Sequence, residues 1–250
     1  MSTTLLAAGI NALERWGIDM DHRPDEASDD ELAEAVRNFD ELYGDMESAL
    51  WCLSTNSRTA LLHGDGGSPI LKELVWTIRS WWSVQGASRE TGPAMARALV
   101  TLEWSPELFE PVETPPVDGE VDAVQRVIAL VEQSRAFGAP RREYSLASKV
   151  LHLLSPWRIP VYDSFVRSHL GIAEPGDRPE ETYARVAHEI FRAARNVTVA
   201  NPAWMGDQEP RALFRAFDKY YWWIGGGHGA TSPQVKNPWA VVDKLGLERS

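Results

Sequence analysis

The sequence lacks most of the residues that mark metal-dependent and secreted proteins. Cys52 is its single cysteine, so the chain can form neither an internal disulfide nor a cysteine-based zinc site. The histidines are scattered, and His188–Glu189 has no second histidine at the spacing of a metalloprotease helix. We therefore expect a reducing compartment, no metal site and no cofactor.

Motifs for nucleotide chemistry and serine hydrolysis are also missing. The chain has no P-loop and no GxSxG elbow. Its glycine-rich segments, GDGGSP (64–69) and IGGGHG (224–229), lack the strand–glycine–helix context of a dinucleotide fingerprint. These absences disfavour nucleoside-triphosphate chemistry and a serine nucleophile.

Long apolar runs are absent as well. No stretch approaches the roughly 20 uninterrupted apolar residues that cross a bilayer. The first residues lack the basic segment of a secretory signal, and their apolar run is interrupted by Glu14 and Arg15. We expect a cytoplasmic protein without a membrane partner.

Positive charge is scarce in the first half of the chain. The net charge is −11, but residues 1–139 carry 10 Lys or Arg against 24 Asp or Glu, whereas residues 140–250 carry 15 against 12. Because polyanions are attracted by positive surfaces, a function that requires contact with phosphate is expected in the second half.

Helical periodicity, in contrast, runs through most of the sequence, and alternating β-branched runs are short. Ser28 followed by Glu31 is a capping box, and Pro69 after Ser68 is a typical helix start. Gly138 marks a helix end. We predict an all-α fold with helices at about 28–43, 69–82, 121–138, 142–154, 163–170, 179–196, 209–224 and 238–245.

A proline-rich stretch divides the chain. Residues 106–119, PELFEPVETPPVDG, are the best linker candidate. They separate an acidic N-terminal helical lobe, 1–105, from a C-terminal helical lobe, 120–250. The two lobes either enclose a cleft, where binding sites commonly lie, or form one compact domain.

Residues 140–171, PRREYSLASKVLHLLSPWRIPVYDSFVRSHLG, concentrate the residues that can do chemistry. Their first helix is apolar except for one polar stripe, formed by Ser145, Ser148, Lys149 and His152. Polar side chains on such a helix must meet solvent or a partner. Pro156 ends this helix, and a tight turn brings Asp163 to the start of the next one as a candidate N-cap, with Gly171 at its end.

This order of a lysine-bearing helix, a proline-containing turn and an aspartate that begins a helix resembles the core of the helix-hairpin-helix DNA glycosylase superfamily. RALFRAFDKYYWWIGGG (211–227) resembles the C-terminal helix of bacterial members that pair SK-x-LH-x-L…P…D with R-x-x-D-K…W. The resemblance implies a two-lobed all-α fold with a base-binding cleft. The hairpin would be degenerate, because RREYSL stands where the family has a glycine-rich hairpin.

The resemblance also implies catalytic roles. Asp163 takes the place of the catalytic aspartate, and Lys149 that of the nucleophilic lysine. A carboxylate at this position would stabilise an oxocarbenium-like sugar or activate water. Because Lys149 lies closer to Asp163 than the family's lysine does, we expect base removal that leaves an abasic site rather than lysine-mediated strand cleavage.

The implied partner is DNA that carries a modified base, bound by a monomeric protein. The base would be flipped into a pocket, whose candidate residues are Tyr144, Ser148, His152, Tyr162 and Trp222. The candidate contacts to the DNA backbone are Arg141, Arg142 and Arg167. Hypermodified bases of phage DNA are one expected target class, which would make the protein an antiviral defence factor.

Two other functions stay open. The same scaffold can serve as a non-catalytic helical module that binds a protein or a nucleic acid, with Asp163 acting only as a helix cap. The GGGHG loop (225–229) can serve as an anion nest in a small-molecule binder. A cleft beside Lys149 and Asp163 would favour the enzyme.

Overall fold

The computed structural model describes residues 28–65, 68–82, 89–112, 116, 118–173, 176, 178–196, 213–227 and 235–249. Within these ranges the chain forms nine α-helices, one short 3₁₀ helix and no strand, which confirms the predicted all-α class. None of the described helices is long and apolar enough to cross a bilayer. Residues 1–27 of the predicted N-terminal lobe lie outside the described ranges.

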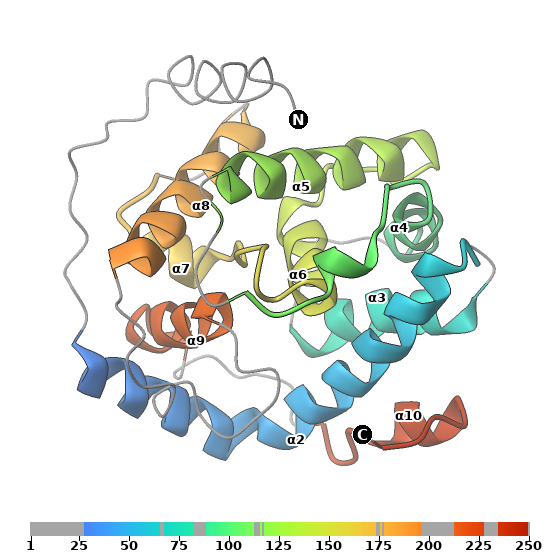
Figure 1. Cartoon of the computed structure of the whole chain (residues 1–250), viewed down its shortest axis with the longest axis horizontal. Helices are drawn as coiled ribbons and strands as arrows, with labels where there is room; N and C mark the ends of the chain where they lie inside the picture. The colour runs from blue at the N-terminus through green and yellow to red at the C-terminus, as the bar shows by residue number, and fades with distance from the viewer. Residues whose placement is uncertain are drawn as a thin grey trace.

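Figure 1 shows the arrangement of the helices. In chain order they are α2 (Asp29–Leu62), α3 (Pro69–Trp81), α4 (Thr91–Leu99), the 3₁₀ helix η1 (Pro106–Leu108), α5 (Gly119–Ala136), α6 (Tyr144–Leu154), α7 (Ser164–His169), α8 (Pro179–Asn196), α9 (Leu213–Ile224) and α10 (Ala240–Lys244).

Local signals fix several helix ends as predicted. The Ser28 hydroxyl accepts a hydrogen bond from the Glu31 amide at 3.3 Å, and the Glu31 carboxylate accepts one from the Ser28 amide at 2.9 Å. Gly138 and Gly171, which follow α5 and α7, have φ angles of 97° and 66°, in the left-handed region that glycine adopts without strain. The capping box and both glycine ends are therefore confirmed.

Two features differ from the prediction. α2 continues for 34 residues, well beyond position 43. The apolar periodicity of a helix cannot be recognised in its second half, because four consecutive residues, Leu50–Leu53, are all buried although they point to different sides of the helix. The sequence does not predict α4, because the adjacent Gly92 and Pro93 in its first turn are residues more typical of loops and turns. The predicted start of α9, residues 209–212, lies outside the described ranges.

α6 occupies the centre of the molecule in Figure 1 and contacts α2, α3, α5 and α8. Its apolar side chains belong to one continuous hydrophobic core that draws residues from both sides of 106–119. Phe109, from the proline-rich stretch, is itself part of this core. The described parts of the two predicted lobes therefore share one core, and α6 is the element around which the other helices pack.

Candidate functional site

The structure brings Lys149 and Asp163 together. Lys149 Nζ lies 3.6 Å from Asp163 Oδ2, and their side chains are 8% and 11% exposed. The other carboxylate oxygen, Oδ1, accepts hydrogen bonds from the amides of Phe165 at 2.9 Å and Val166 at 3.0 Å. Asp163 is thus the N-cap of α7, as predicted, and still presents one oxygen to a cation.

The turn between α6 and α7 is held by two members of the predicted polar stripe. Ser148 Oγ accepts a hydrogen bond from the Tyr162 amide at 3.0 Å. His152 Nδ1 lies 2.6 Å from the Ile159 carbonyl oxygen, and since a carbonyl only accepts, Nδ1 carries the hydrogen. Both side chains are fully buried. They fix the returning chain against α6 and so position Asp163 beside Lys149.

A buried charged cluster adjoins this pair. Its other members come from α2 and α9, which pack against each other (Figure 1): the partly exposed Asp40 and the buried Glu47, Arg215, Asp218 and Lys219. Arg215 pairs with both Glu47 and Asp218. Lys219 Nζ pairs with Asp40 and lies 2.8 Å from Glu47 Oε2. Glu47 is therefore the carboxylate that ties both cations of α9 to α2.

Trp82, at the end of α3, connects the two groups of charges. Its ring centroid lies 5.9 Å from Lys149 Nζ and 5.0 Å from the Arg215 guanidinium carbon. Its carbonyl oxygen lies 3.4 Å from Lys149 Nζ. Contacts of this kind between cations and an aromatic face are attractive. Trp82 was not among the predicted site residues, and nothing in its local sequence distinguishes it from Trp76 or Trp81 on the same helix.

Burial governs the protonation of this region. Burial, helped by the negative charge of Asp163, raises the pKa of Asp218 to about 6 against the pull of Arg215. Burial also lowers the pKa of His152 to about 3, because the charged imidazolium loses its hydration and meets Arg215. For Glu47 burial pushes the pKa upward, but Arg215 and Lys219 outweigh it and the net direction is downward.

The aromatic residues predicted for a base pocket take part in packing. Tyr144 and Tyr162 are buried and lie with their ring centroids 6.5 Å and 6.0 Å from that of Tyr183. Trp222 meets three rings edge to face at centroid distances of 5.4–6.1 Å, those of Phe39, Tyr43 and Phe165. A base pocket formed by these side chains stays a prediction.

The predicted arginine contacts differ in exposure. Arg141 and Arg142 are exposed at the entrance to α6, and Arg142 Nε lies 2.9 Å from Glu132 Oε1. Arg167 is only 6% exposed and donates a hydrogen bond to the Ile172 carbonyl at 3.1 Å. Because its guanidinium is engaged inside the fold, Arg167 is not suited to contact a DNA backbone.

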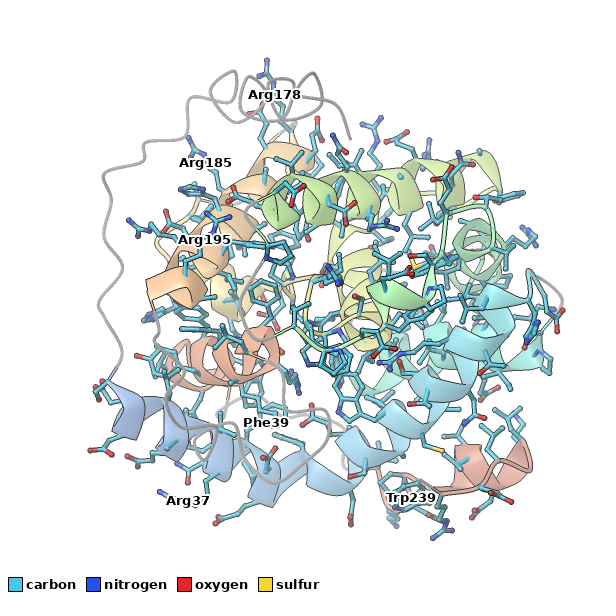
Figure 2. The ribbon with its side chains drawn as sticks, in the orientation of Figure 1. Arg37, Phe39, Arg178, Arg185, Arg195 and Trp239 are labelled. Atoms are coloured by element: carbon cyan, nitrogen blue, oxygen red, sulfur yellow. The ribbon has the colours of Figure 1, made fainter. Side chains whose placement is uncertain are left out.

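Other exposed arginines lie along α8. Figure 2 shows Arg178, Arg185 and Arg195 following one outer edge of the molecule. Arg178 is paired with Glu181 at 2.7 Å, and Arg195 lies 3.6 Å from Glu120. This edge was not predicted as a contact surface, although its residues belong to the more basic second half of the chain.

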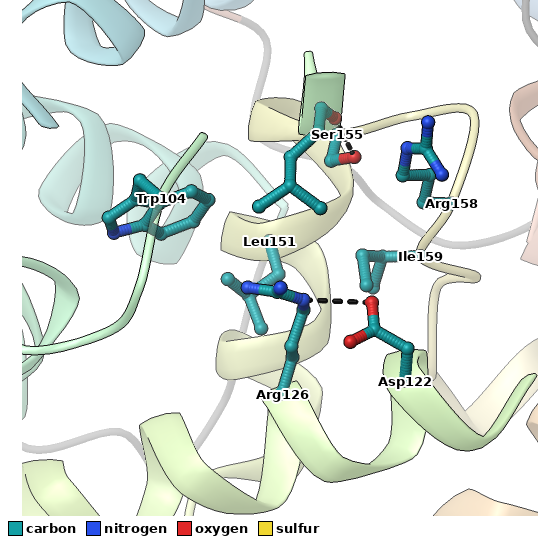
Figure 3. A pocket seen from close by; sticks show the side chains of 8 residues that line it. Trp104, Asp122, Arg126, Leu151, Ser155, Arg158 and Ile159 are labelled. Atoms are coloured by element: carbon teal, nitrogen blue, oxygen red, sulfur yellow. Dashed lines mark hydrogen bonds and ion pairs between the residues drawn. The ribbon is translucent and has the colours of Figure 1, made fainter. Parts of the chain in front are cut away.

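A small hollow lies between the C-terminal end of α6, at Leu151 and Ser155, and Asp122 and Arg126 of α5 (Figure 3). It has a volume of about 10 Å³, room for about one water molecule, and is therefore too small for a nucleobase. The Arg126–Asp122 ion pair, 2.8 Å long, lies at its edge. This hollow is separate from the Lys149–Asp163 pair and does not extend the candidate site.

Two glycines of the GGGHG loop, Gly225 and Gly227, lie close to their neighbours. A Cβ at Gly225 would lie 2.7 Å from the carbonyl oxygens of Phe165 and Tyr221. A Cβ at Gly227 would collide with the Trp222 ring. Glycine is needed here for the approach of α9 to α7; residues 228–229 of the predicted anion nest lie outside the described ranges.

Metal ligands do not gather in the portion of the chain that the structure describes: no group of three or more His, Cys, Asp or Glu side chains there could hold an ion. Comparisons with protein-family models, with curated proteins and with solved structures give no match.

Proposed function

We propose that the protein is a DNA glycosylase-like enzyme that hydrolyses the N-glycosidic bond of a modified base and leaves an abasic site. One observation carries the proposal: Asp163 is fixed at the N-terminus of α7 through one oxygen, while its second oxygen faces Lys149 at 3.6 Å. A rigidly held carboxylate whose second oxygen lies beside a cation is the kind of group that this reaction uses.

In the proposed reaction the bond between the base and C1′ breaks first, and the base departs with the electron pair. Asp163 stabilises the positive charge that develops on the sugar. Water then adds to C1′, and Asp163 takes up the proton that the water loses. Asp163 then returns this proton to solvent, from which the departed base takes one up, so atoms and charge balance and the carboxylate is regenerated.

Lys149 has an orienting role in this scheme. Its ammonium is paired with Asp163 and lies against the ring and carbonyl of Trp82. An amine that attacks C1′ must instead be uncharged and directed at the sugar. These contacts support hydrolysis, in which Lys149 holds the carboxylate in place, over a covalent lysine intermediate.

DNA would approach from the more basic part of the chain. Arg141, Arg185 and Arg195 are exposed in that part, and arginine side chains are common contacts to backbone phosphates. We propose them as backbone contacts in place of Arg167. The expected substrate is duplex or single-stranded DNA with a bulky modified base, such as the hypermodified bases of phage genomes.

The test is base release by wild-type protein and the D163N variant on unmodified and hypermodified DNA, with abasic sites detected by alkaline cleavage. Asparagine keeps an oxygen for the α7 cap, so the variant should fold. We expect its rate to fall by a factor on the order of 10²–10⁴. D45N, at an exposed aspartate of α2, is the matched control and should keep full activity.

Two outcomes would contradict the proposal. Retained base release by D163N would remove Asp163 from the chemistry. DNA binding without base release by the wild type would instead favour the non-catalytic module, which the cap role of Asp163 and the internal bonds of Ser148 and His152 also support.

A further inference from the structure

The charged cluster contains more acids than bases. Four carboxylates (Asp40, Glu47, Asp163 and Asp218) face three cations (Lys149, Arg215 and Lys219). A surplus negative charge in a buried cluster is costly, because it is removed from water without a counter-ion. One carboxylate of the cluster therefore tends to retain a proton.

The contacts single out Asp218. Glu47 contacts two cations, Arg215 and Lys219, and Asp163 contacts Lys149. Asp218 has only Arg215 as a salt-bridge partner among the residues described, and it shares that guanidinium with Glu47. It is also only 5% exposed, so water compensates little of its charge.

The packing of α7 on α9 places Asp218 within the electrostatic reach of Asp163. The two helices are in contact, and Gly225 lets the α9 end approach the Phe165 carbonyl, two residues after Asp163. The charges of Asp163 and Lys149 both act on the Asp218 carboxyl. A change of charge on Asp218 is therefore felt by the pair that we propose to carry out the reaction.

We infer that Asp218 is a positioning residue for the Lys149–Asp163 pair: it carries the exchangeable proton of the cluster, and on losing it adds a negative charge that strengthens the hold of Asp163 on a cationic sugar. This inference rests on the proposed function. It adds a residue from a different helix to the site and gives the reaction a specific dependence on pH.

The groups that face Asp218 support this assignment. They are Arg215 from α9, Asp163 from the start of α7, Lys149 from α6 and Glu47 from α2. The other titratable groups of the region are Asp40, His152 and Lys219, which interact with Arg215, Glu47 or one another. The pKa of Asp218 is raised to about 6, chiefly by burial. The pKa of His152 is lowered to about 3 and that of Glu47 is also lowered, so neither titrates near pH 6.

Asp40 is the other carboxyl of the cluster whose pKa is raised by burial. It differs from Asp218 in position, because it pairs with Lys219 at the α2 side of the cluster. The D40N variant therefore serves as the matched control for removing a titratable carboxyl from the same cluster without removing the one beside Asp163.

The experiment measures kcat and KM for base release between pH 5 and pH 8 for wild type, D218N, D218E and D40N. For wild type we expect kcat to rise on the order of tenfold through pH 6, equivalent to about 1.4 kcal/mol of transition-state stabilisation. D218N should lack this rise while KM stays within about twofold, and D218E should restore a rise with a displaced midpoint, because a carboxyl on a longer side chain meets different neighbours. D40N should keep a rise, displaced to lower pH because three carboxylates then face three cations.

A second measurement does not depend on activity. Because the pKa of Asp218 is raised in the fold, protonated Asp218 favours the folded state, and this contribution is lost as the pH rises through about 6. Relative to D218N, the wild type should therefore lose stability between pH 5 and pH 7.

The outcomes separate the two claims. If the wild type releases no base but shows this stability difference, the proposed function is overturned, whereas the assignment of the exchangeable proton to Asp218 still holds. A D218N variant with the wild-type pH profile and no stability difference overturns the role of Asp218. If D218N does not fold, a D218E profile with an unshifted rise through pH 6 overturns it equally.

Discussion

His152 makes the fold sensitive to acid. The side chain is fully buried on α6 and donates from Nδ1 to the Ile159 carbonyl, while Nε2 has no hydrogen-bond partner among the described residues. In the unfolded chain the imidazole takes up a proton near pH 6.5, whereas burial lowers its pKa in the fold to about 3. Below pH 6.5 the unfolded state therefore binds a proton that the folded state does not, and acid favours unfolding.

The magnitude follows from the difference in pKa. Across the whole interval from pH 6.5 to pH 3 the loss amounts to about 5 kcal/mol, at about 1.4 kcal/mol for each pH unit. Between pH 7 and pH 4.5 it is about 2.5 kcal/mol. Domains of this size are stable by about 5–15 kcal/mol in total, so the effect is large enough to measure. Asp218 opposes it over part of the range, because its protonation favours the folded state.

Comparison with the H152N variant isolates the contribution of His152 protonation to the pH dependence of stability. The asparagine amide can still donate to the Ile159 carbonyl but cannot titrate. We expect H152N to be less stable than wild type at pH 7.5, and the difference between the two to shrink by about 2.5 kcal/mol between pH 7 and pH 4.5. Urea denaturation followed by tryptophan fluorescence at several pH values measures both.

H63N controls for the loss of a histidine, since His63 is exposed at the end of α2. If wild type and H152N lose stability in parallel as the pH falls, His152 is either protonated or accessible in the fold. The reasoning from burial would then be refuted.

Two further predictions concern the packing of α9. E47A should lower the free energy of unfolding by about 3–5 kcal/mol, because it leaves Arg215 and Lys219 buried without a shared counter-ion; a urea titration that finds a loss below about 1 kcal/mol would contradict this. G225A should destabilise the protein by about 1–3 kcal/mol through collision of the new Cβ with the Phe165 and Tyr221 carbonyls, which a thermal melt detects, whereas G176A, where a Cβ meets nothing, should melt like wild type.

Local sequence signals predict Asp163 as an N-cap, whereas its pairing with Lys149 is what the family resemblance implies. The two residues are 14 positions apart, and the intervening helix, proline-containing turn and N-cap are each encoded by neighbouring residues. The same kind of signal gave the capping box at Ser28. It also identified Ser148 and His152 as polar residues in need of partners, without showing that their partners are backbone groups of the next turn.

The rest of the candidate site depends on which helices meet. Glu47 and Arg215 are 168 positions apart, and helical periodicity says nothing about the pairing of α2 with α9. The R-x-x-D-K spacing places Arg215, Asp218 and Lys219 on one side of a helix, but not opposite acids of the first half. The sequence pattern also did not reveal the full length of α2, because the consecutive buried residues Leu50–Leu53 interrupt its alternation of apolar and polar faces.

Some of the acidic residues counted in the first 139 positions are turned inward. Glu47 neutralises cations of α9, and Glu120, only 4% exposed, lies 3.0 Å from His188 and 3.6 Å from Arg195. Such carboxylates act as internal counter-ions and contribute little to the field outside the protein. Because their partner cations belong to the second half, the contrast in charge between the two halves is smaller at the surface than the residue counts suggest.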